Sequence, residues 1–287
     1  MGITAGVEIE FQVNGNKISG VRWGDKEGTP FFALHGWLDN SASFQFLAPL
    51  LEHSCLISLD LPGHGHSYHR THLGAYNIWQ DIAEIVVISN QLGWKKFGLM
   101  GHSRGAMVAT LFAATFPEKI SSLVLIEAVV PQSNDAEESP SQLASSIESI
   151  VQQSKRSRHY YRAFSDAVAS RQRGFVPLGK EDATVLAERG VFEDENGFYW
   201  GNDYKLLSPS EVKFTSAQIN AFLRCISMPV LLIAAQDGLI HEMCELQSLL
   251  SKIANITLVE LDGNHHLHMS SKAVELAERI NEFIVQG

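Results

Sequence analysis

The sequence has few cysteines, no long apolar run and no surplus of basic residues. Its three cysteines, Cys55, Cys225 and Cys244, are widely spaced over 287 residues, a distribution that indicates free thiols rather than a disulfide framework. No window approaches the ~18 consecutive apolar residues of a membrane span. Residues 1–15 lack the basic-then-apolar order of a signal peptide. These absences predict a cytoplasmic protein that does not bind membranes.

The charge balance also narrows the class of partner. Lys and Arg total 22 against 32 Asp and Glu, a net charge of −10, which argues against nucleic acid as the main ligand. Hydrophobic residues make up 45% of the chain, enough for a large globular core. We therefore expect a small-molecule ligand, and the sequence gives no oligomeric state.

The first local pattern is a β-hairpin. Alternating apolar residues in Val7–Val13 and Lys17–Trp23 flank the pair Asn14-Gly15. A two-residue type I′ turn needs two positive φ angles, which Asn-Gly adopts readily.

After Pro30, short apolar runs alternate with segments of helical period, which predicts an α/β protein with a mostly parallel sheet covered on both faces. The expected strands are Phe31–Leu34, Cys55–Leu59, Phe97–Met100, Leu123–Ile126, Val230–Ala234 and Ile256–Leu261. The expected helices are Ser43–Leu51, Tyr76–Leu92, Gly105–Phe116, Leu239–Ile253 and Lys272–Val285.

One long segment, from about Pro131 to Arg224, shows no buried strand. Helices are expected at Ser139–Ser154, His159–Arg173 and Glu181–Arg189. We predict an inserted helical cap at 131–225, between core segments 1–130 and 226–287. Basic residues in it form either a solvated helix face or a patch that attracts acidic substrates; they are Lys155, Arg156, Arg158, Arg162, Arg171 and Arg173.

The most informative motif is G-x-S-x-G, formed by Gly101, Ser103 and Gly105 between an expected strand and an expected helix. This motif places a serine on a sharp strand-to-helix turn, a nucleophile elbow, where flanking residues must be small. The following helix N-terminus favours developing negative charge. Ser103 is therefore the predicted nucleophile.

A serine nucleophile needs a base, and the chain has 12 histidines. His35 and His102 lie at strand ends inside glycine-flanked motifs, and we expect them to brace the site. The run of histidines at positions 64, 66, 69 and 72 lacks companion ligands at a familiar spacing, so no metal is predicted. The loop after the last strand carries three candidates for the base: His265, His266 and His268.

The third triad member should be a carboxylate that orients the imidazole. Asp237 follows the strand Val230–Ala234 and gives the chain order Ser, Asp, His of this architecture. Glu127 competes with it, because it follows the strand Leu123–Ile126 at the same sheet edge. Asp237 is the preferred prediction.

An oxyanion hole needs two N–H donors. The backbone N–H groups of Trp37, after the strand Phe31–Leu34, and of Arg104, after the nucleophile, are in the expected places. We expect the Trp37 side chain to wall the pocket, and the Arg104 side chain either to form a salt bridge on the core or to orient a polar substrate.

These motifs resemble the α/β-hydrolase superfamily over about Thr29–Ile284, and their spelling is similar to its serine hydrolase-like branch. They are LHGWLDN at Leu34–Asn40, LDLPGHGHS at Leu59–Ser67, GHSRG at Gly101–Gly105, AAQDG at Ala234–Gly238 and GNHHLHM at Gly263–Met269. The stretch Ala167–Gln172 and the pair Arg189-Gly190 also resemble that branch.

The resemblance implies an α/β-hydrolase fold with a helical cap, and it assigns the base to His265. Ser103 and Arg104 stand where haloalkane dehalogenases have Asp and a halide-binding Trp, so the chain does not resemble a dehalogenase. The chain also lacks the C-terminal peroxisomal signal S-K-L, so a peroxisomal location is not predicted.

The predicted function is a cofactor-independent serine hydrolase, of the carboxylesterase class EC 3.1, acting on a small or medium ester-like substrate. C–C bond hydrolysis, lactonase and thioesterase activities are alternatives, since the same triad serves them. A binding protein on the hydrolase fold is the non-enzymatic alternative.

Overall fold

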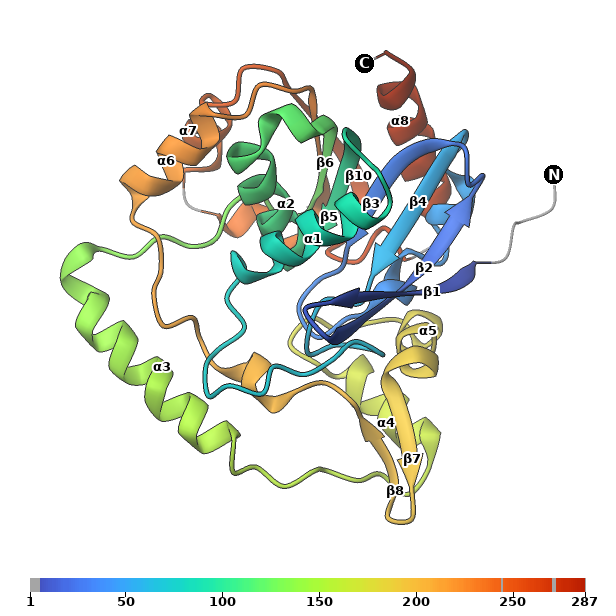
Figure 1. Ribbon diagram of the computed structural model, residues 1–287, viewed down its shortest axis with the longest axis vertical. Helices are drawn as coiled ribbons and strands as arrows, with labels where there is room; N and C mark the ends of the chain where they lie inside the picture. The colour runs from blue at the N-terminus through green and yellow to red at the C-terminus, as the bar shows by residue number, and fades with distance from the viewer. Residues whose placement is uncertain (1–5, 244, 270–271, 287) are drawn as a thin grey trace.

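An eight-stranded, mostly parallel sheet forms the centre of the computed structural model, which describes residues 6–243, 245–269 and 272–286 (Figure 1). The strand order is β1-β2-β4-β3-β5-β6-β9-β10. Pairs β1–β2 and β2–β4 are antiparallel and the remaining pairs are parallel. The bounds are β1 Val7–Val13, β2 Asn16–Gly24, β3 Thr29–Leu34, β4 Ser54–Leu59, β5 Phe97–His102, β6 Ile120–Ile126, β9 Val230–Asp237 and β10 Ile256–Asn264.

The predicted N-terminal hairpin is confirmed. Val13 pairs with Asn16, and the two turn residues Asn14 and Gly15 have φ of 50° and 77°. This is the pair of positive φ angles that the Asn-Gly sequence favours.

Two apolar layers cover the two faces of the sheet. Residues such as Phe32 and Leu34 face one layer, whereas their neighbours Phe31 and Ala33 face the other, as the two-residue period of a strand requires. The first layer is completed by α1 (Gln80–Gln91), α2 (Arg104–Thr115) and α6 (Ser216–Arg224), and the second by α8 (Ala273–Gln286) (Figure 1).

One of the expected helices is wrong in type, and another is interrupted. The segment 43–51 forms two short 3-10 turns, η1 (Ser41–Phe44) and η2 (Ala48–Leu50), and Pro49 at the start of η2 cannot donate a helical hydrogen bond. The segment 239–253 divides into η6 (Leu239–Glu242) and α7 (Leu246–Leu250), because Glu245 has a left-handed φ of 59°. Apolar spacing alone did not reveal these interruptions.

The insertion after β6 contains both helices and a hairpin. Its elements are η4 (Ala136–Glu138), α3 (Ser139–Gln153), α4 (Phe164–Gln172), α5 (Lys180–Gly190), β7 (Val191–Asp194), β8 (Gly197–Trp200) and η5 (Tyr204–Leu207). The prediction of an all-helical insertion is therefore wrong in one element, although β7 and β8 pair with each other outside the central sheet. Tyr161 forms a bridge to Phe198, so α4 starts at Phe164 and not at His159.

The C-terminal limit of the insertion lies earlier than predicted. Ile219 and Leu223 of α6 are buried in the apolar layer that contains α2 and the sheet. Helix α6 therefore belongs with the core. We call residues 131–214 the cap; in Figure 1 most of it lies below the sheet, with α3 at its outer side.

The cap rests on the core through α4 and α5. Val168, Ala183 and Leu186 form a separate apolar cluster with Ala42 and Met269 of the core.

The structure describes two of the three cysteines that were predicted to be free thiols. Cys55 is a buried free thiol whose pKa is raised by burial, and Cys225 is an exposed one. Cys244 lies outside the described residues. Among the helices of the described chain, none is long and apolar enough to cross a bilayer.

Candidate active site

Ser103 lies on a strained turn between β5 and α2. Its φ of 51° and ψ of −115° are rare for a residue with a side chain, and its amide donates to the carbonyl oxygen of Ile126 at 2.9 Å. This is the geometry of a nucleophile elbow.

The two glycines of the motif are required by close backbone approach. A Cβ atom on Gly101 would lie 2.3 Å from the carbonyl oxygen of Gly105. A Cβ atom on Gly105 would lie 2.0 Å from the carbonyl oxygen of Leu34. The spacing of G-x-S-x-G thus reflects packing of the elbow against β3, in addition to the strain at Ser103.

The imidazole of His265 is held by Glu127. Its Nδ1 atom lies 3.0 Å from Oε2 of Glu127, and the two side chains are 7% and 0% exposed. Nδ1–H therefore donates to the carboxylate, which leaves Nε2 with the lone pair that a general base needs. The prediction that Asp237 orients His265 is wrong, and the alternative acid, Glu127, holds that place.

The backbone around Glu127 fixes its carboxylate. Glu127 follows β6 with a left-handed φ of 63°, and its Oε1 atom accepts a hydrogen bond from the amide of Ala235 at 2.6 Å. Gly238 leaves room for it, since a Cβ there would lie 2.2 Å from Oε2. The glycine after Asp237 thus serves the carboxylate of the neighbouring strand.

Asp237 itself is exposed at the end of β9, where it pairs in register with Asn264. A solvated carboxylate there is not in position to fix the tautomer of a buried imidazole. The sequence could not separate the two acids, because β6 and β9 are adjacent parallel strands that end at the same edge.

The first predicted oxyanion donor, the backbone N–H of Trp37, lies in the loop after β3. Gly36 to Asp39 form a turn in which Asp39 N donates to Gly36 O at 3.3 Å and Leu38 has φ of 61°. Trp37 lines the same cavity as Ser103, as expected, and its indole Nε1 donates to Leu206 O of the cap at 2.8 Å.

The second predicted donor, the amide of Arg104, is in the first turn of α2, where N–H groups have no intrahelical acceptor. The Arg104 side chain points to the core. Its Nη2 atom lies 2.8 Å from Asp81 Oδ2 and the residue is 9% exposed. Of the two expectations for this side chain, the structure shows the salt bridge.

His35 and His64 brace the loops around the elbow. His35 accepts a hydrogen bond from Leu61 N at 3.0 Å and donates to Gly36 O at 2.7 Å. His64 accepts from Leu38 N at 3.3 Å. Burial lowers the pKa of both rings, so both act as neutral bridges.

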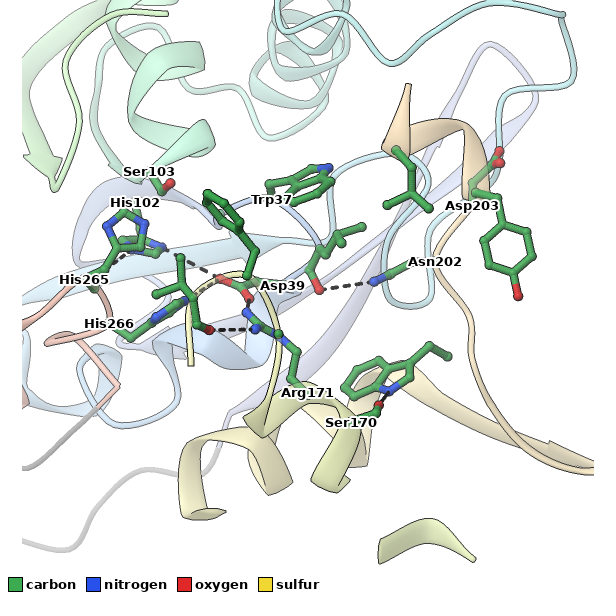
Figure 2. Close-up of a pocket in the computed structure, with 18 of the residues that line it drawn as sticks. Trp37, Asp39, His102, Ser103, Ser170, Arg171, Asn202, Asp203, His265 and His266 are labelled. Atoms are coloured by element: carbon green, nitrogen blue, oxygen red, sulfur yellow. Dashed lines mark hydrogen bonds and ion pairs between the residues drawn. The ribbon is translucent and has the colours of Figure 1, made fainter. Parts of the chain in front are cut away.

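Ser103 and His265 line one cavity of about 380 Å³ between core and cap (Figure 2). The cap contributes aromatic and basic residues, and of those named here the sequence analysis singled out only Arg156, as part of the basic patch. They include Arg156, His159, Tyr161, Phe175, Trp200 and Tyr204.

The expected basic patch of the cap is divided among local partners. Arg156 lies over the ring of Tyr204 at 4.8 Å, and Arg158 over that of Tyr199 at 3.9 Å. Arg171 is withdrawn into an ion pair with Asp39 at 2.7 Å. No single stripe results from these three side chains.

Asp39 is a buried carboxylate of the site that the sequence analysis did not identify. Figure 2 shows Arg171 and His266 directed towards it. Burial opposes its ionisation, but His266 and Arg171 outweigh that effect and hold the pKa of Asp39 well below its usual range. The only signal was its place in the LHGWLDN motif.

A model of the α/β hydrolase fold family matches residues 29–272. The chain belongs to that family. Among curated proteins, a probable serine hydrolase of Drosophila melanogaster is 31% identical over 86% of this chain and 78% of its own. Serine hydrolase-like protein 2 of Homo sapiens is 28% identical over 96% of this chain and 93% of its own.

Two solved structures are similar to this one over nearly the whole chain. A hypothetical protein of Pseudomonas aeruginosa has a TM-score of 0.91 and 32% identity over 97% of this chain and 98% of its own. A thioesterase domain from the curacin biosynthetic pathway has a TM-score of 0.83 and 26% identity over 96% of this chain and 99% of its own. The protein is therefore an α/β hydrolase of the serine hydrolase-like branch.

Proposed function

We propose that this hydrolase cleaves small or medium carboxylic esters through a Ser103–His265–Glu127 triad. The observation that carries the proposal is the 3.0 Å contact between His265 Nδ1 and Glu127, with Ser103 on a strained elbow in the same cavity. A carboxylate-oriented imidazole beside such a serine is the arrangement that activates a hydroxyl for acyl transfer.

In the proposed reaction, Ser103 Oγ attacks the ester carbonyl carbon while His265 Nε2 takes the hydroxyl proton. The N–H groups of Trp37 and Arg104 stabilise the oxyanion. His265 then gives the proton to the leaving alcohol, which produces an acyl-enzyme. Water then attacks the acyl-enzyme while His265 takes its proton, and that proton passes to Ser103 Oγ as the carboxylic acid leaves. Glu127 stabilises the imidazolium throughout.

The test combines an active-site label with a substrate panel. We expect a fluorophosphonate to modify Ser103 alone, identified by peptide mapping, and p-nitrophenyl esters of graded chain length to be hydrolysed. Ser103→Ala should lower turnover at least about 10³-fold with unchanged folding. Ser170→Ala is the matched control, because Ser170 lines the same cavity but hydrogen-bonds to Ala167 O.

The outcomes separate the possibilities. An adduct on another serine would contradict the triad. Labelling without ester turnover would retain Ser103 as nucleophile and exclude these esters as substrates. The absence of both labelling and turnover would favour a binding protein.

Thioester hydrolysis is the second candidate, favoured by the likeness to the curacin-pathway thioesterase domain at 26% identity. The cavity has aromatic and aliphatic walls from the cap that suit an apolar acyl chain. Acyl thioesters matched in chain length to the p-nitrophenyl esters decide between the two through their kcat/KM ratio.

A further inference from the structure

Asp39, His102 and His266 converge beside His265 from three separate loops and strand ends. Asp39 follows β3, His102 ends β5 and His266 follows β10. Asp39 Oδ2 lies 3.8 Å from His102 Nδ1 and 3.7 Å from His266 Nε2, and the three atoms all lie within 4.8 Å of one another. Each of the three side chains is at most 4% exposed.

Two of these buried atoms, Asp39 Oδ2 and His102 Nδ1, have no hydrogen-bond partner. His102 uses Nε2 to donate to His265 O at 2.8 Å, so its Nδ1 carries a lone pair. A carboxylate oxygen and a lone pair thus face each other, an unfavourable arrangement unless a cation or donor lies between them.

We propose that Asp39, His102 and His266 bind one divalent transition metal ion of the zinc and cobalt type. Two imidazole nitrogens and a carboxylate oxygen are preferred ligands of these ions. Metal–ligand distances of about 2.0–2.2 Å place ligand atoms roughly 3.3–3.6 Å apart, so the closer pairs need to contract only slightly. All three residues line the active-site cavity, which gives the ion a route in and a place for a water ligand.

The surrounding charges set the expected affinity and selectivity. Arg171 Nη2 lies 2.7 Å from Asp39 Oδ1 and offsets its negative charge, which weakens binding. Asp182 of α5 interacts electrostatically with His266 and adds negative charge near the site, which favours binding. We expect binding of Zn²⁺ and Co²⁺, and no binding of Mg²⁺, which requires oxygen ligands.

Occupation of this site should inhibit the enzyme. The rings of His102 and His265 are 4.7 Å apart, and the two residues share a hydrogen bond. A bound ion reorients the His102 ring, whose Nε2 holds the backbone carbonyl of His265, and thereby displaces the His265 imidazole from Ser103. Inhibition rests on the proposed function, whereas metal binding does not.

The binding test uses CoCl₂ and untagged protein in which Cys225 and Cys244 are replaced by Ser, so that these two thiols do not compete. We expect a visible d–d absorption band that saturates at one ion per chain. His266→Gln should weaken the affinity at least about 10-fold, and Asp39→Asn should do the same. His53→Gln, at an exposed histidine, should leave it unchanged.

Circular dichroism checks that each variant is folded. If Asp39→Asn does not fold, the affinity of His266→Gln tests the site. Absence of a saturable band, or a band unchanged in His266→Gln, would overturn the site.

Zn²⁺ should also suppress ester turnover and labelling of Ser103, with reversal by EDTA and relief in His266→Gln. Saturable binding without this suppression would keep the site and overturn its coupling to His265. If the protein shows neither turnover nor labelling, the proposed function fails, and the Co²⁺ titration alone decides the metal site.

Discussion

Glu127 connects two parallel strands through one side chain. One carboxylate oxygen accepts from the backbone of β9 at Ala235 and the other faces His265, while the left-handed backbone at Glu127 turns the chain out of β6. Gly238 provides the space for this carboxylate. The strain at Glu127 and Ser103 is thus concentrated where the proposed triad is assembled.

The role of Glu127 can be tested against that of Asp237 with paired amide substitutions. Glu127→Gln should lower turnover by on the order of 10⁴, because the amide favours the wrong tautomer of His265. Asp237→Asn should change turnover less than about threefold, since its carboxylate is exposed and Glu127 already occupies the position at His265 Nδ1. Turnover of matched ester substrates is the measurement, and a larger loss in Asp237→Asn would contradict the assignment.

A buried charge network connects helix α1 to Arg104, the residue that follows Ser103 in the elbow. Asp81 pairs with Arg104 at 2.8 Å and Arg70 at 3.3 Å, and Glu84 pairs with Arg70 at 3.1 Å. The Tyr68 hydroxyl donates a hydrogen bond to Glu84 Oε1 at 2.5 Å. Two carboxylates in a buried site share two guanidinium groups, and the less well paired acid is disfavoured as an anion.

Stability should depend on pH through Glu84. Burial and the nearby Asp81 raise its pKa from 4.5 to about 7. A raised carboxyl pKa gives a stabilising contribution that is complete below about pH 4.5 and is lost as pH rises through 7. The stability difference between wild type and Glu84→Gln should therefore fall between pH 5 and 8, by at most on the order of 3 kcal/mol.

Urea unfolding of both proteins at several pH values measures this difference. Glu278→Gln, at an exposed glutamate of α8, is the control and should show no such trend. A Glu84→Gln difference independent of pH would show that Glu84 keeps one protonation state across this range.

For the whole molecule, Arg189 of α5 fixes the cap to the core. Its guanidinium donates to both oxygens of Asp60 at 3.0 Å, and it also pairs with Glu8 of β1. Asp60 is fully buried; burial opposes its ionisation, but Arg189 outweighs that effect and lowers its pKa. This buried pair is one of the contacts that join the cap to the core, beside Arg171–Asp39 and the apolar cluster around Val168.

Removal of Arg189 should leave a buried, uncompensated carboxylate. We expect Arg189→Gln to lower the free energy of unfolding by about 3–5 kcal/mol. Glu8→Gln is the matched control and should cost less than about 1 kcal/mol, because the Glu8 side chain is 63% exposed. Equal losses in the two variants would contradict the special role of the pair with Asp60.

The sequence by itself determined the features that depend on neighbouring residues. Asn14-Gly15 fixed the hairpin, apolar runs fixed most sheet strands, and G-x-S-x-G fixed the elbow at Ser103. Each of these follows from local φ angles, side-chain period or the need for a small residue. For the same reason, helix interruptions such as the left-handed Glu245 escaped a reading based on apolar spacing.

Only the tertiary structure decided which distant groups meet. Glu127 and His265 are 138 positions apart, and Asp39 and Arg171 are 132 apart. The choice of Glu127 over Asp237 depends on adjacent strands that end at one edge and on side-chain directions there, which sequence order does not encode. The gathering of Asp39, His102 and His266 likewise depends on three loops brought together by the strand order β3-β5-β6-β9-β10 and by the docked cap.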